Sequence, residues 1–388
     1  MTTYQEPTGQ ELAGHLHYSV LPSPYEVFMK EQGIPIYRDI GVYDSRQLPL
    51  GPWKRMGGQG SFIQLDGQAG YFGLYVVQVP AGGVLNAEHH MYEELFLVIE
   101  GRGSTEVWKE GSAKKQAFEW QPGTHFAVPL NASHRLVNAT SSPALLLVAT
   151  SAPQVMGLFP LRSFVFDSAQ DFPDRYDQSD DYFKPRDQLE PNPQDGRALL
   201  RTNVIPDIAH CYLPLDNQRL PGYRRVIPKM AGDTFFTGFI AEYPSGRYSK
   251  AHYHQPGIIL VCLRGKGYTY TWPKELGIHP WETGKGHLVK RQDYIAGGMV
   301  SAAPAPGGGD WFHQHFCVSK DLFRVRAIGG GRIVADQAGD QVTGANAEMA
   351  EGGHSVAYRD EDAHIQREYK AMLKKEGVEF QMPASSFK

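Results

Sequence analysis

Hydrophobic positions along the chain gather into short runs that are separated by glycine and proline. These runs are rich in β-branched and aromatic residues, a composition typical of strands. We expect strands at residues 74–79, 95–101, 124–130 and 144–150, and again at residues 237–243, 258–265 and 268–272. Many short strands with regular turns predict a sandwich or a barrel.

Helical periodicity is confined to two segments near the ends of the chain. In residues 24–33 and 361–377, apolar residues recur at helical spacing, with acidic residues first and lysines last. This order of charges complements the helix dipole. We therefore expect short helices that flank a β-rich core.

The chain contains an internal repeat. When it is shifted by 164 positions, residues 80–108 align with residues 244–272 without a gap, and Pro80, His90 and Trp108 are among those that meet identical residues. The repeat predicts two copies of one β unit. Between the copies, residues 167–198 are acidic, proline-bearing and poor in aliphatic side chains. This composition predicts an exposed connector.

Composition and charge exclude several classes of function. A chain of 388 residues, of which 41% are hydrophobic, can form one large domain or two of ordinary size. A net charge of -4 gives no broad cationic field for nucleic acid or anionic lipid. We see neither a signal-peptide pattern nor an apolar run long enough for a membrane helix, so we expect a cytoplasmic protein without nucleic-acid or membrane partners. Three widely spaced residues, Cys211, Cys262 and Cys317, form no disulfide framework.

Two groups of glycine, histidine and acidic residues mark the first copy. The first group is Gly82, Glu88, His90, Glu94 and Gly101, and the second is Gly123, Pro129, Asn131, His134 and Asn138. Their spacing closely resembles the two cupin motifs, with Glu88 where the family usually has histidine. The resemblance implies an all-β fold of two tandem cupin barrels, which are double-stranded β-helices or jelly rolls, with short flanking helices.

The resemblance also sets the expected domain boundaries. They are an N-terminal arm with a short helix at residues 1–49, a first barrel at 50–166, the acidic connector at 167–198, a second barrel at 199–335, and a C-terminal tail with a helix at 336–388.

Alternation along a strand predicts a metal centre in the first barrel. Side chains two residues apart share a face, so Glu88 and His90 point together while His89 points away. By the resemblance, Glu94 and His134 complete the ligand set. Histidines and carboxylates with open positions suit non-heme iron, and manganese also accepts them.

The second copy retains part of this pattern. It keeps the glycines and two histidines of the first motif, at Gly246, His252, His254 and Gly265, but Ile258 stands at the glutamate position. Residues 311–316 add His313 and His315. A centre of three histidines without the carboxylate resembles those of gentisate and salicylate dioxygenases, which are bicupins with a similar run. By that resemblance His313 is the ligand and His315 contacts the substrate.

The expected function follows from the neutral ligand set. Three imidazoles leave a bound Fe(II) ion its double charge, which favours an anionic bidentate substrate. We expect an Fe(II) dioxygenase, an oxidoreductase that cleaves an aromatic gentisate- or salicylate-like substrate or an enolizable carboxylate. Arg264, Arg324 or Arg326 would hold the substrate carboxylate. An aromatic wall is expected from Tyr268, Tyr270, Trp272, Trp311 and Phe312.

Two alternatives remain open. The first is a non-oxygenase bicupin, that is, a manganese, nickel or zinc hydrolase, lyase, isomerase or decarboxylase. Glu88 favours it, because ureide-hydrolyzing bicupins resemble this chain in placing Glu at the first ligand position. The second alternative is a non-catalytic binding protein. In each case we expect a small-molecule ligand and a homo-oligomer, and the sequence leaves open which barrel is catalytic.

Overall fold

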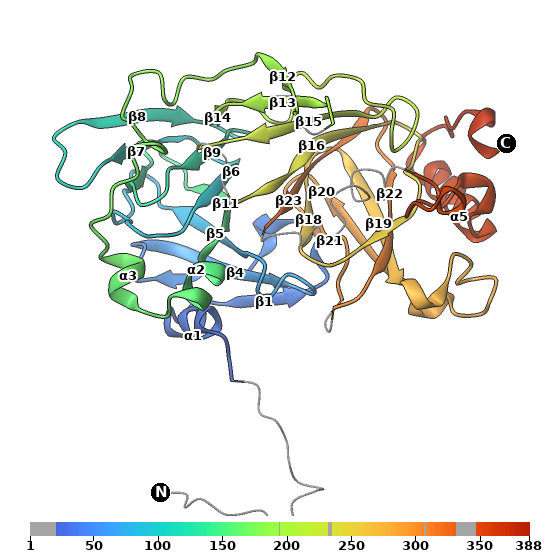
Figure 1. Cartoon of the computed structure of the whole chain (residues 1–388), viewed down its shortest axis with the longest axis horizontal. Coiled ribbons are helices and arrows are strands. Elements are labelled where there is room, and N and C mark those ends of the chain that lie inside the picture. The colour runs from blue at the N-terminus through green and yellow to red at the C-terminus, as the bar shows by residue number, and fades with distance from the viewer. Residues whose placement is uncertain (1–20, 194, 232–234, 306–307, 331–346) are drawn as a thin grey trace, which may run out of the picture.

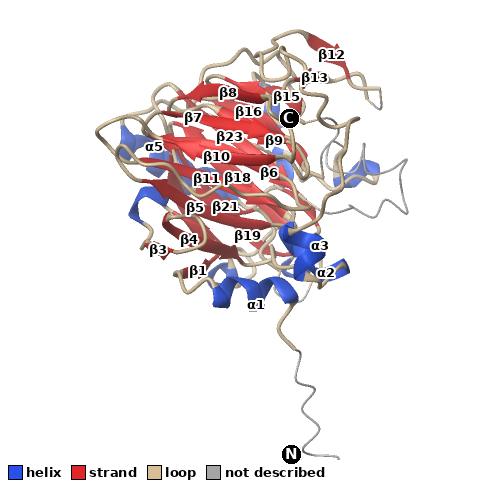
Figure 2. Cartoon of the chain, turned by 90° about the vertical axis from the view of Figure 1, so that its left-hand side faces the viewer, coloured by secondary structure: helices blue, strands red, loops and turns tan. Residues whose placement is uncertain are grey.

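Two β-barrels lie side by side in the computed structural model of the chain, which describes residues 21–193, 195–231, 235–305, 308–330 and 347–388 (Figure 1). Strands dominate both barrels, and the helices lie at their edges (Figure 2). The predicted fold class, two tandem barrels with short flanking helices, is confirmed. No helix within these ranges is long and apolar enough to cross a membrane.

A large sheet and a small sheet form the first barrel. The large sheet has the order β1-β4-β5-β11-β6-β9-β14, with β3 paired to β4, and the small sheet has the order β10-β7-β8. The strands from the first half of the chain are β1 (Ile36–Asp39), β3 (Gly51–Trp53), β4 (Gly58–Leu65), β5 (Gly73–Val79), β6 (Glu94–Glu100), β7 (Gly103–Trp108), β8 (Lys115–Trp120), β9 (His125–Val128), β10 (Ser133–Val137) and β11 (Ala144–Thr150).

The second barrel has the same construction. Its large sheet has the order β12-β13-β15-β16-β23-β18-β21-β2, and its small sheet has the order β17-β22-β19-β20. Its strands from the second half of the chain are β12 (Leu189–Pro191), β13 (Ala198–Arg201), β15 (Arg224–Lys229), β16 (Thr237–Pro244), β17 (His252–His254), β18 (Ile258–Arg264), β19 (Lys266–Pro273), β20 (Lys290–Ile295), β21 (Met299–Ser301), β22 (Trp311–Cys317) and β23 (Leu322–Gly329).

The internal repeat is confirmed strand for strand. The order β4-β5-β11-β6-β9 of the first barrel recurs as β15-β16-β23-β18-β21 in the second. The register agrees as well: Glu94 lies opposite Thr150, and Ile258, 164 residues after Glu94, lies opposite Gly329 at the corresponding place. The two copies therefore share topology and residue alignment.

Each copy donates a short strand to the other barrel. Strand β2 (Gly41–Val42) precedes the first barrel but pairs with β21 of the second. Strand β14 (Val204–Ile205) precedes the second barrel but pairs with β9 of the first. These two exchanged strands connect the barrels. The segment before residue 50, which was expected to be an arm with a helix, therefore also contributes β1 to the large sheet of the first barrel and β2 to that of the second.

A shared hydrophobic core lies between the barrels. It joins apolar residues from the large sheets of both copies, for example Val76, Leu97 and Leu147 from the first and Ile240 and Val261 from the second. Alternate residues of the same strands point into each barrel, as the twofold alternation of a strand requires. The outer faces of the two large sheets therefore pack against each other and are shielded from solvent at this contact.

Four α-helices lie within the described ranges: α1 (Pro24–Glu31), α2 (Ala152–Leu158), α3 (Arg162–Phe166) and α5 (Ala363–Glu376). The two expected helices, α1 and α5, are confirmed. Ser23 and Glu26 form a capping box at the start of α1, and Gly377 ends α5 in the left-handed conformation that glycine tolerates. Helices α2 and α3 were not expected, because each is too short to display helical periodicity.

The acidic connector is more ordered than its composition predicts. Tyr176 and Phe183 are buried in the core of the first barrel, and the Tyr176 hydroxyl donates a hydrogen bond to Gln116 of β8 at 2.8 Å. Strand β12 also lies within the connector. The segment therefore wraps the first barrel, and its aromatic residues anchor it. The expected boundary between residues 335 and 336 lies outside the described residues. Residues 1–20 of the expected arm also lie outside them.

Candidate metal centres

His90, Glu94 and His134 come together inside the first barrel, with one ligand-type atom of each within 4.8 Å of the others. The Nε2 atoms of His90 and His134 lie 3.3 Å and 3.6 Å from Glu94 Oε2. All three side chains are almost fully buried, with at most 3% exposed. His89 lines a separate cavity and does not belong to this cluster, as strand alternation led us to expect.

Backbone carbonyls orient both imidazoles of this cluster. His90 Nδ1 lies 2.9 Å from the Tyr92 carbonyl oxygen, and His134 Nδ1 lies 3.3 Å from that of Ala132. Donation from Nδ1 leaves Nε2 unprotonated and directed at Glu94, which is the form that binds a metal. Burial acts to raise the pKa of Glu94, but the two histidines, when protonated, outweigh it and hold that pKa well below its ordinary value, and a cation bound at the same place would act in the same direction.

Glu88 does not join this cluster. Its carboxylate forms an ion pair with Arg55, and both side chains line a small cavity beside Glu94. The expectation that Glu88 is a fourth ligand is therefore not met in this arrangement, because a neighbouring cation satisfies its charge. Arg55 lies 33 residues before Glu88 in the chain, outside both motifs.

His252, His254 and His313 form the corresponding cluster in the second barrel, again within 4.8 Å of one another. The Nε2 atoms of His252 and His313 are 2.9 Å apart. His254 Nδ1 contacts the carbonyl oxygen of Gln255 at 2.5 Å, which leaves its Nε2 for the cluster. The three histidines predicted from the sequence are thus brought together by β17 and β22, which pair with His252 opposite His313.

Sheet register distinguishes His313 from His315. In the first barrel His134 lies opposite Val107, and in the second His313 lies opposite Thr271, the residue 164 positions after Val107. His313 is therefore the counterpart of His134. His315 lies two residues farther along β22, opposite Thr269, and its Nδ1 contacts the Thr269 hydroxyl at 2.8 Å.

Arg219 lies beside the second cluster. Burial and then the charge of Arg219 lower the pKa of His252 well below its ordinary value, and the same causes lower that of His315 to about 3. Burial is also the main cause that lowers the pKa of His254 to about 4. The imidazoles of His252, His254 and His315 are therefore neutral at physiological pH, which is the form in which histidine binds a metal.

Neither arginine near the clusters was expected from the sequence. A shift of 164 positions aligns Arg219 with Arg55 and Gly222 with Gly58. In the sheets, however, the pairing of β15 with β16 is offset by one residue from that of β4 with β5. Both arginines precede the aligned histidine motifs, so the motifs alone do not point to them.

The three arginines expected to bind substrate have other partners. Arg264 pairs with Asp321 at the surface. Arg324 pairs with Glu242 at 2.5 Å, and Arg326 is buried between the barrels, where it contacts His125. None of these contacts involves a residue of the second cluster, so the structure lends no support to the expected role of Arg264 as a catalytic residue.

The expected aromatic wall mostly faces away from the second cluster. Strand alternation directs His313 and His315 inward and Phe312 outward on β22. The outward residues pack in a separate core against helix α5, and they are Tyr268, Tyr270, Trp272 and Phe312. Only Trp311 of the five shares a face with His313, and it is half-buried.

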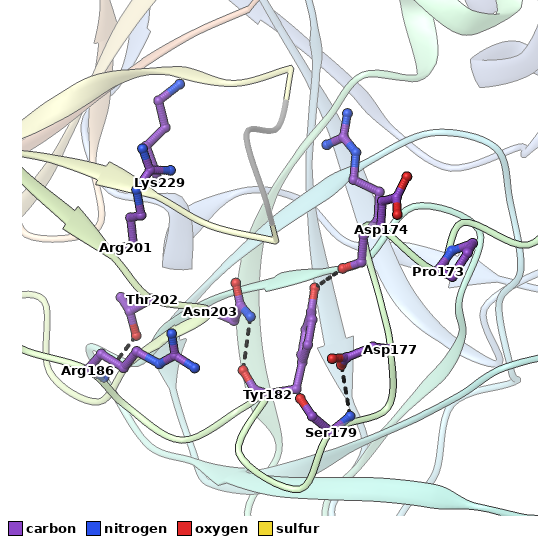
Figure 3. Close-up of a pocket in the computed structure, with 11 residues that line it drawn as sticks. Pro173, Asp174, Asp177, Ser179, Tyr182, Arg186, Arg201, Thr202, Asn203 and Lys229 are labelled. Atoms are coloured by element: carbon purple, nitrogen blue, oxygen red, sulfur yellow. Dashed lines mark hydrogen bonds between the residues drawn. The ribbon is translucent and has the colours of Figure 1, made fainter. Parts of the chain in front are cut away.

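A polar cavity lies elsewhere. It has a volume of about 280 Å³ and lies between the connector and the start of the second barrel, lined by charged and polar residues such as Asp174, Arg186, Arg201 and Lys229 (Figure 3). Ion pairs engage two of these arginines, Arg186 with Asp181 and Arg201 with Glu190. None of its lining residues belongs to either histidine cluster.

A third group of ligand-type residues, His279, Glu282 and Asp362, lies at the start of α5. The Asp362 carboxylate accepts hydrogen bonds from the backbone N–H groups of Trp281, Glu282 and His364. It therefore caps the helix and holds the neighbouring loop, a structural role that accounts for its burial.

The donor sets of both histidine clusters fit a divalent metal ion. Among the described residues, the Nε2 atom of His90 is buried without a hydrogen-bond partner, and the Nε2 atoms of His252 and His313 lie 2.9 Å apart without a further hydrogen bond to either. Unpaired buried polar atoms are rare in folded proteins. Three converging imidazoles, or two with a carboxylate, match the ligands of iron, manganese and zinc.

Comparison with known proteins gives a match for the first copy. Residues 75–150 match the Cupin_2 model, a cupin domain. No curated protein sequence matches the chain. Solved structures similar to the chain include an oxalate decarboxylase–formate complex from Lactobacillus farciminis, with a TM-score of 0.45, 9% identity, and coverage of 75% of this chain and 86% of that chain. Another is the Mn(II)-containing oxalate decarboxylase of Bacillus subtilis, with a TM-score of 0.45, 10% identity, and coverage of 77% and 79%. The first barrel, which contains His90, Glu94 and His134, thus matches a cupin domain, and the second barrel repeats its strand order.

Proposed function

We propose that this protein is a metal-dependent enzyme that acts on a small anionic molecule at the cluster of His252, His254 and His313. One observation carries the choice of this barrel. His254 and the neighbouring Arg219 are half-buried, whereas His90, Glu94 and His134 are enclosed. The greater exposure of His254 supports substrate access to the second cluster, although His252 and His313 are themselves buried.

The charge of the second cluster favours an anion. Its three ligand-type residues are neutral imidazoles, and Arg219 adds a positive charge beside them. A bound divalent ion would supply a Lewis acid that polarises a substrate oxygen. Iron, manganese, nickel and zinc all accept such ligands, and iron, as first expected, is one candidate among them.

Two further side chains have roles in this proposal. Arg219 binds a substrate carboxylate, because a guanidinium offers paired N–H donors to its oxygens. His315 contacts the substrate as a neutral imidazole, oriented by its contact with Thr269. Burial of the site strengthens both interactions by excluding water.

We infer that the substrate is a small aliphatic carboxylate and that the reaction does not consume oxygen. The outward orientation of Tyr268, Tyr270 and Phe312 removes most of the wall that an aromatic ring would need. This favours the non-oxygenase alternative, such as a decarboxylase or another lyase. A dioxygenase acting on an enolizable carboxylate is the second candidate, because three neutral ligands suit non-heme iron.

Turnover of small mono- and dicarboxylates with and without oxygen tests the proposal. The protein is loaded separately with iron, manganese, nickel and zinc, and substrate loss is measured in air and under anaerobic conditions. Equal turnover in air and under anaerobic conditions supports a non-oxygenase. Turnover only in air, with one oxygen molecule taken up for each substrate molecule lost, supports the dioxygenase. Absence of turnover with every metal and carboxylate would contradict an enzymatic function on this substrate class.

A further inference from the structure

Some corresponding positions at the two histidine clusters carry different side chains. A shift of 164 positions aligns Arg55 with Arg219 and Glu88 with His252. The first barrel thus combines an arginine with a carboxylate, and the second combines an arginine with an imidazole. The neighbouring strands have the same register, because Glu88 bridges to His134 as His252 pairs with His313.

Glu88 is held firmly against Arg55. Its backbone N–H donates to the His134 carbonyl oxygen at 2.8 Å, and the His134 N–H donates back to the Glu88 carbonyl oxygen at 2.9 Å. Glu88 is 6% exposed, and the Arg55 guanidinium lies 4.2 Å from the centre of the Phe166 ring. The guanidinium therefore has an aromatic face on one side and a fixed carboxylate as its anion.

Little free space remains around this pair. The adjoining cavity has a volume of about 10 Å³ and is lined by Tyr25, Tyr75, Tyr92 and Glu94 together with Arg55 and Glu88. That volume accommodates about one water molecule. The Arg55 side chain is 26% exposed, but on its inner side the Glu88 carboxylate, whose side chain is 7% exposed, already takes the place that an anion beside the metal cluster would need.

We propose that Glu88 is a built-in occupant of a carboxylate-binding subsite at Arg55, and that it closes the first barrel to anionic small molecules. The subsite is latent: it has a guanidinium, an aromatic wall and a neighbouring metal cluster, but the chain supplies its own carboxylate. The proposal concerns the first barrel alone and is independent of the reaction carried out in the second, so ligand binding and turnover are measured separately.

Removal of the Glu88 side chain provides a direct test with acetate. The Glu88→Ala change deletes a methylene and a carboxylate, which together match acetate in size and charge. We expect the variant to have a lower unfolding midpoint than the wild type, because Arg55 is left without its anion. Sodium acetate should restore the midpoint in a saturable manner, at a concentration at least about tenfold below that needed for any effect on the wild type.

Three controls separate specific binding from general effects. Acetamide has the same shape without charge and should not restore the midpoint, and sodium chloride corrects for ionic strength. The Glu88→Asp variant keeps a carboxylate and should respond less to acetate. The double variant Arg55→Met and Glu88→Ala removes the guanidinium and should not respond.

Two results would overturn the proposal. One is a Glu88→Ala protein that acetate and chloride affect equally. The other is a Glu88→Ala protein that loses metal from the first barrel and shows no acetate response, which would make Glu88 a metal ligand. If this variant is recovered unfolded, its refolding is followed by circular dichroism with and without acetate, and failure of acetate to promote refolding also counts against the proposal.

Discussion

His252 and His313 face each other on neighbouring strands, with their Nε2 atoms 2.9 Å apart. Two lone pairs at this distance would repel each other, so either one neutral imidazole donates its Nε2 proton to the other or both nitrogens bind one cation. Burial lowers the pKa of both histidines and keeps them neutral, which is the form that binds a metal. The geometry therefore fits a metal ion held by both Nε2 atoms.

Replacement of His313 should remove metal from the second barrel. We expect His313→Ala to lower the metal affinity of this cluster by at least about 100-fold, because a ligand is lost. His315→Ala should retain the metal, since register makes His313 the counterpart of His134. Metal content per chain after dialysis distinguishes the two variants, with His89→Ala as a control. Equal metal loss in the His313 and His315 variants would contradict the assignment.

The affinity for small carboxylates should depend on Arg219. Its guanidinium lies beside neutral imidazoles, so we expect Arg219→Gln to weaken carboxylate binding to the metal-loaded protein by about 10- to 100-fold. Calorimetric titration measures the change, and metal content should stay at the wild-type level. Arg264→Gln serves as the matched control, because Arg264 pairs with Asp321 and should be replaceable without effect on binding. Unchanged affinity in the Arg219 variant would remove this residue from the site.

The exchanged strand β2 should stabilise the second barrel. A Cβ atom added at Gly41 would lie 2.5 Å from the Met299 carbonyl oxygen of β21. We therefore expect Gly41→Ala to reduce the free energy of unfolding by about 1–3 kcal/mol and to increase amide hydrogen exchange in β21. Gly157→Ala is the control, since nothing lies within 4 Å of that position. Equal stability of the two variants would show that the β2 contact contributes little.

Acid should weaken the contact between the barrels through His125. Burial, followed by the charge of Arg326, lowers the pKa of His125 from 6.5 to about 3. The unfolded chain then takes up a proton near its ordinary pKa that the folded protein does not. This group therefore reduces stability as pH falls below about 6.5, by about 1.4 kcal/mol for each pH unit, until the folded pKa is reached.

Urea unfolding at several pH values measures this effect. His125→Gln removes the titrating group and keeps hydrogen-bonding capacity toward Phe96 and Arg326. We expect the wild type to lose more stability than this variant between pH 7 and pH 5. Parallel pH profiles would show that His125 is protonated in the folded protein.

Local patterns predicted most of the fold. The repeat required two copies of one topology, and helical spacing with its order of charges located α1 and α5. The exchange of β2 and β14 was not predictable, because each strand is too short to show alternation and its partner is distant in sequence. Burial of Tyr176 and Phe183 was likewise hidden in an acidic segment whose overall composition resembles an exposed connector.

Strand alternation also predicted the histidine clusters, since it fixes which side chains share a face. It did not predict their surroundings. The partner of Glu88 comes from a loop that no motif includes, and the aromatic residues near His313 alternate away from it. Arg55 was not expected because it lies far from Glu88 in the sequence. The aromatic wall was overestimated because residues near His313 in sequence were counted without regard to the face of the strand on which they lie.

A comparison of the His254→Ala and Glu94→Ala proteins tests the central claim most directly. The claim is that the second barrel is the site of the chemistry and that the first holds an enclosed metal. Metal content and carboxylate turnover are measured in both variants alongside the wild type. We predict that His254→Ala loses turnover and one metal site, while Glu94→Ala loses the other metal site and retains most of its turnover. Full turnover in His254→Ala with none in Glu94→Ala would contradict the account and place the reaction in the first barrel.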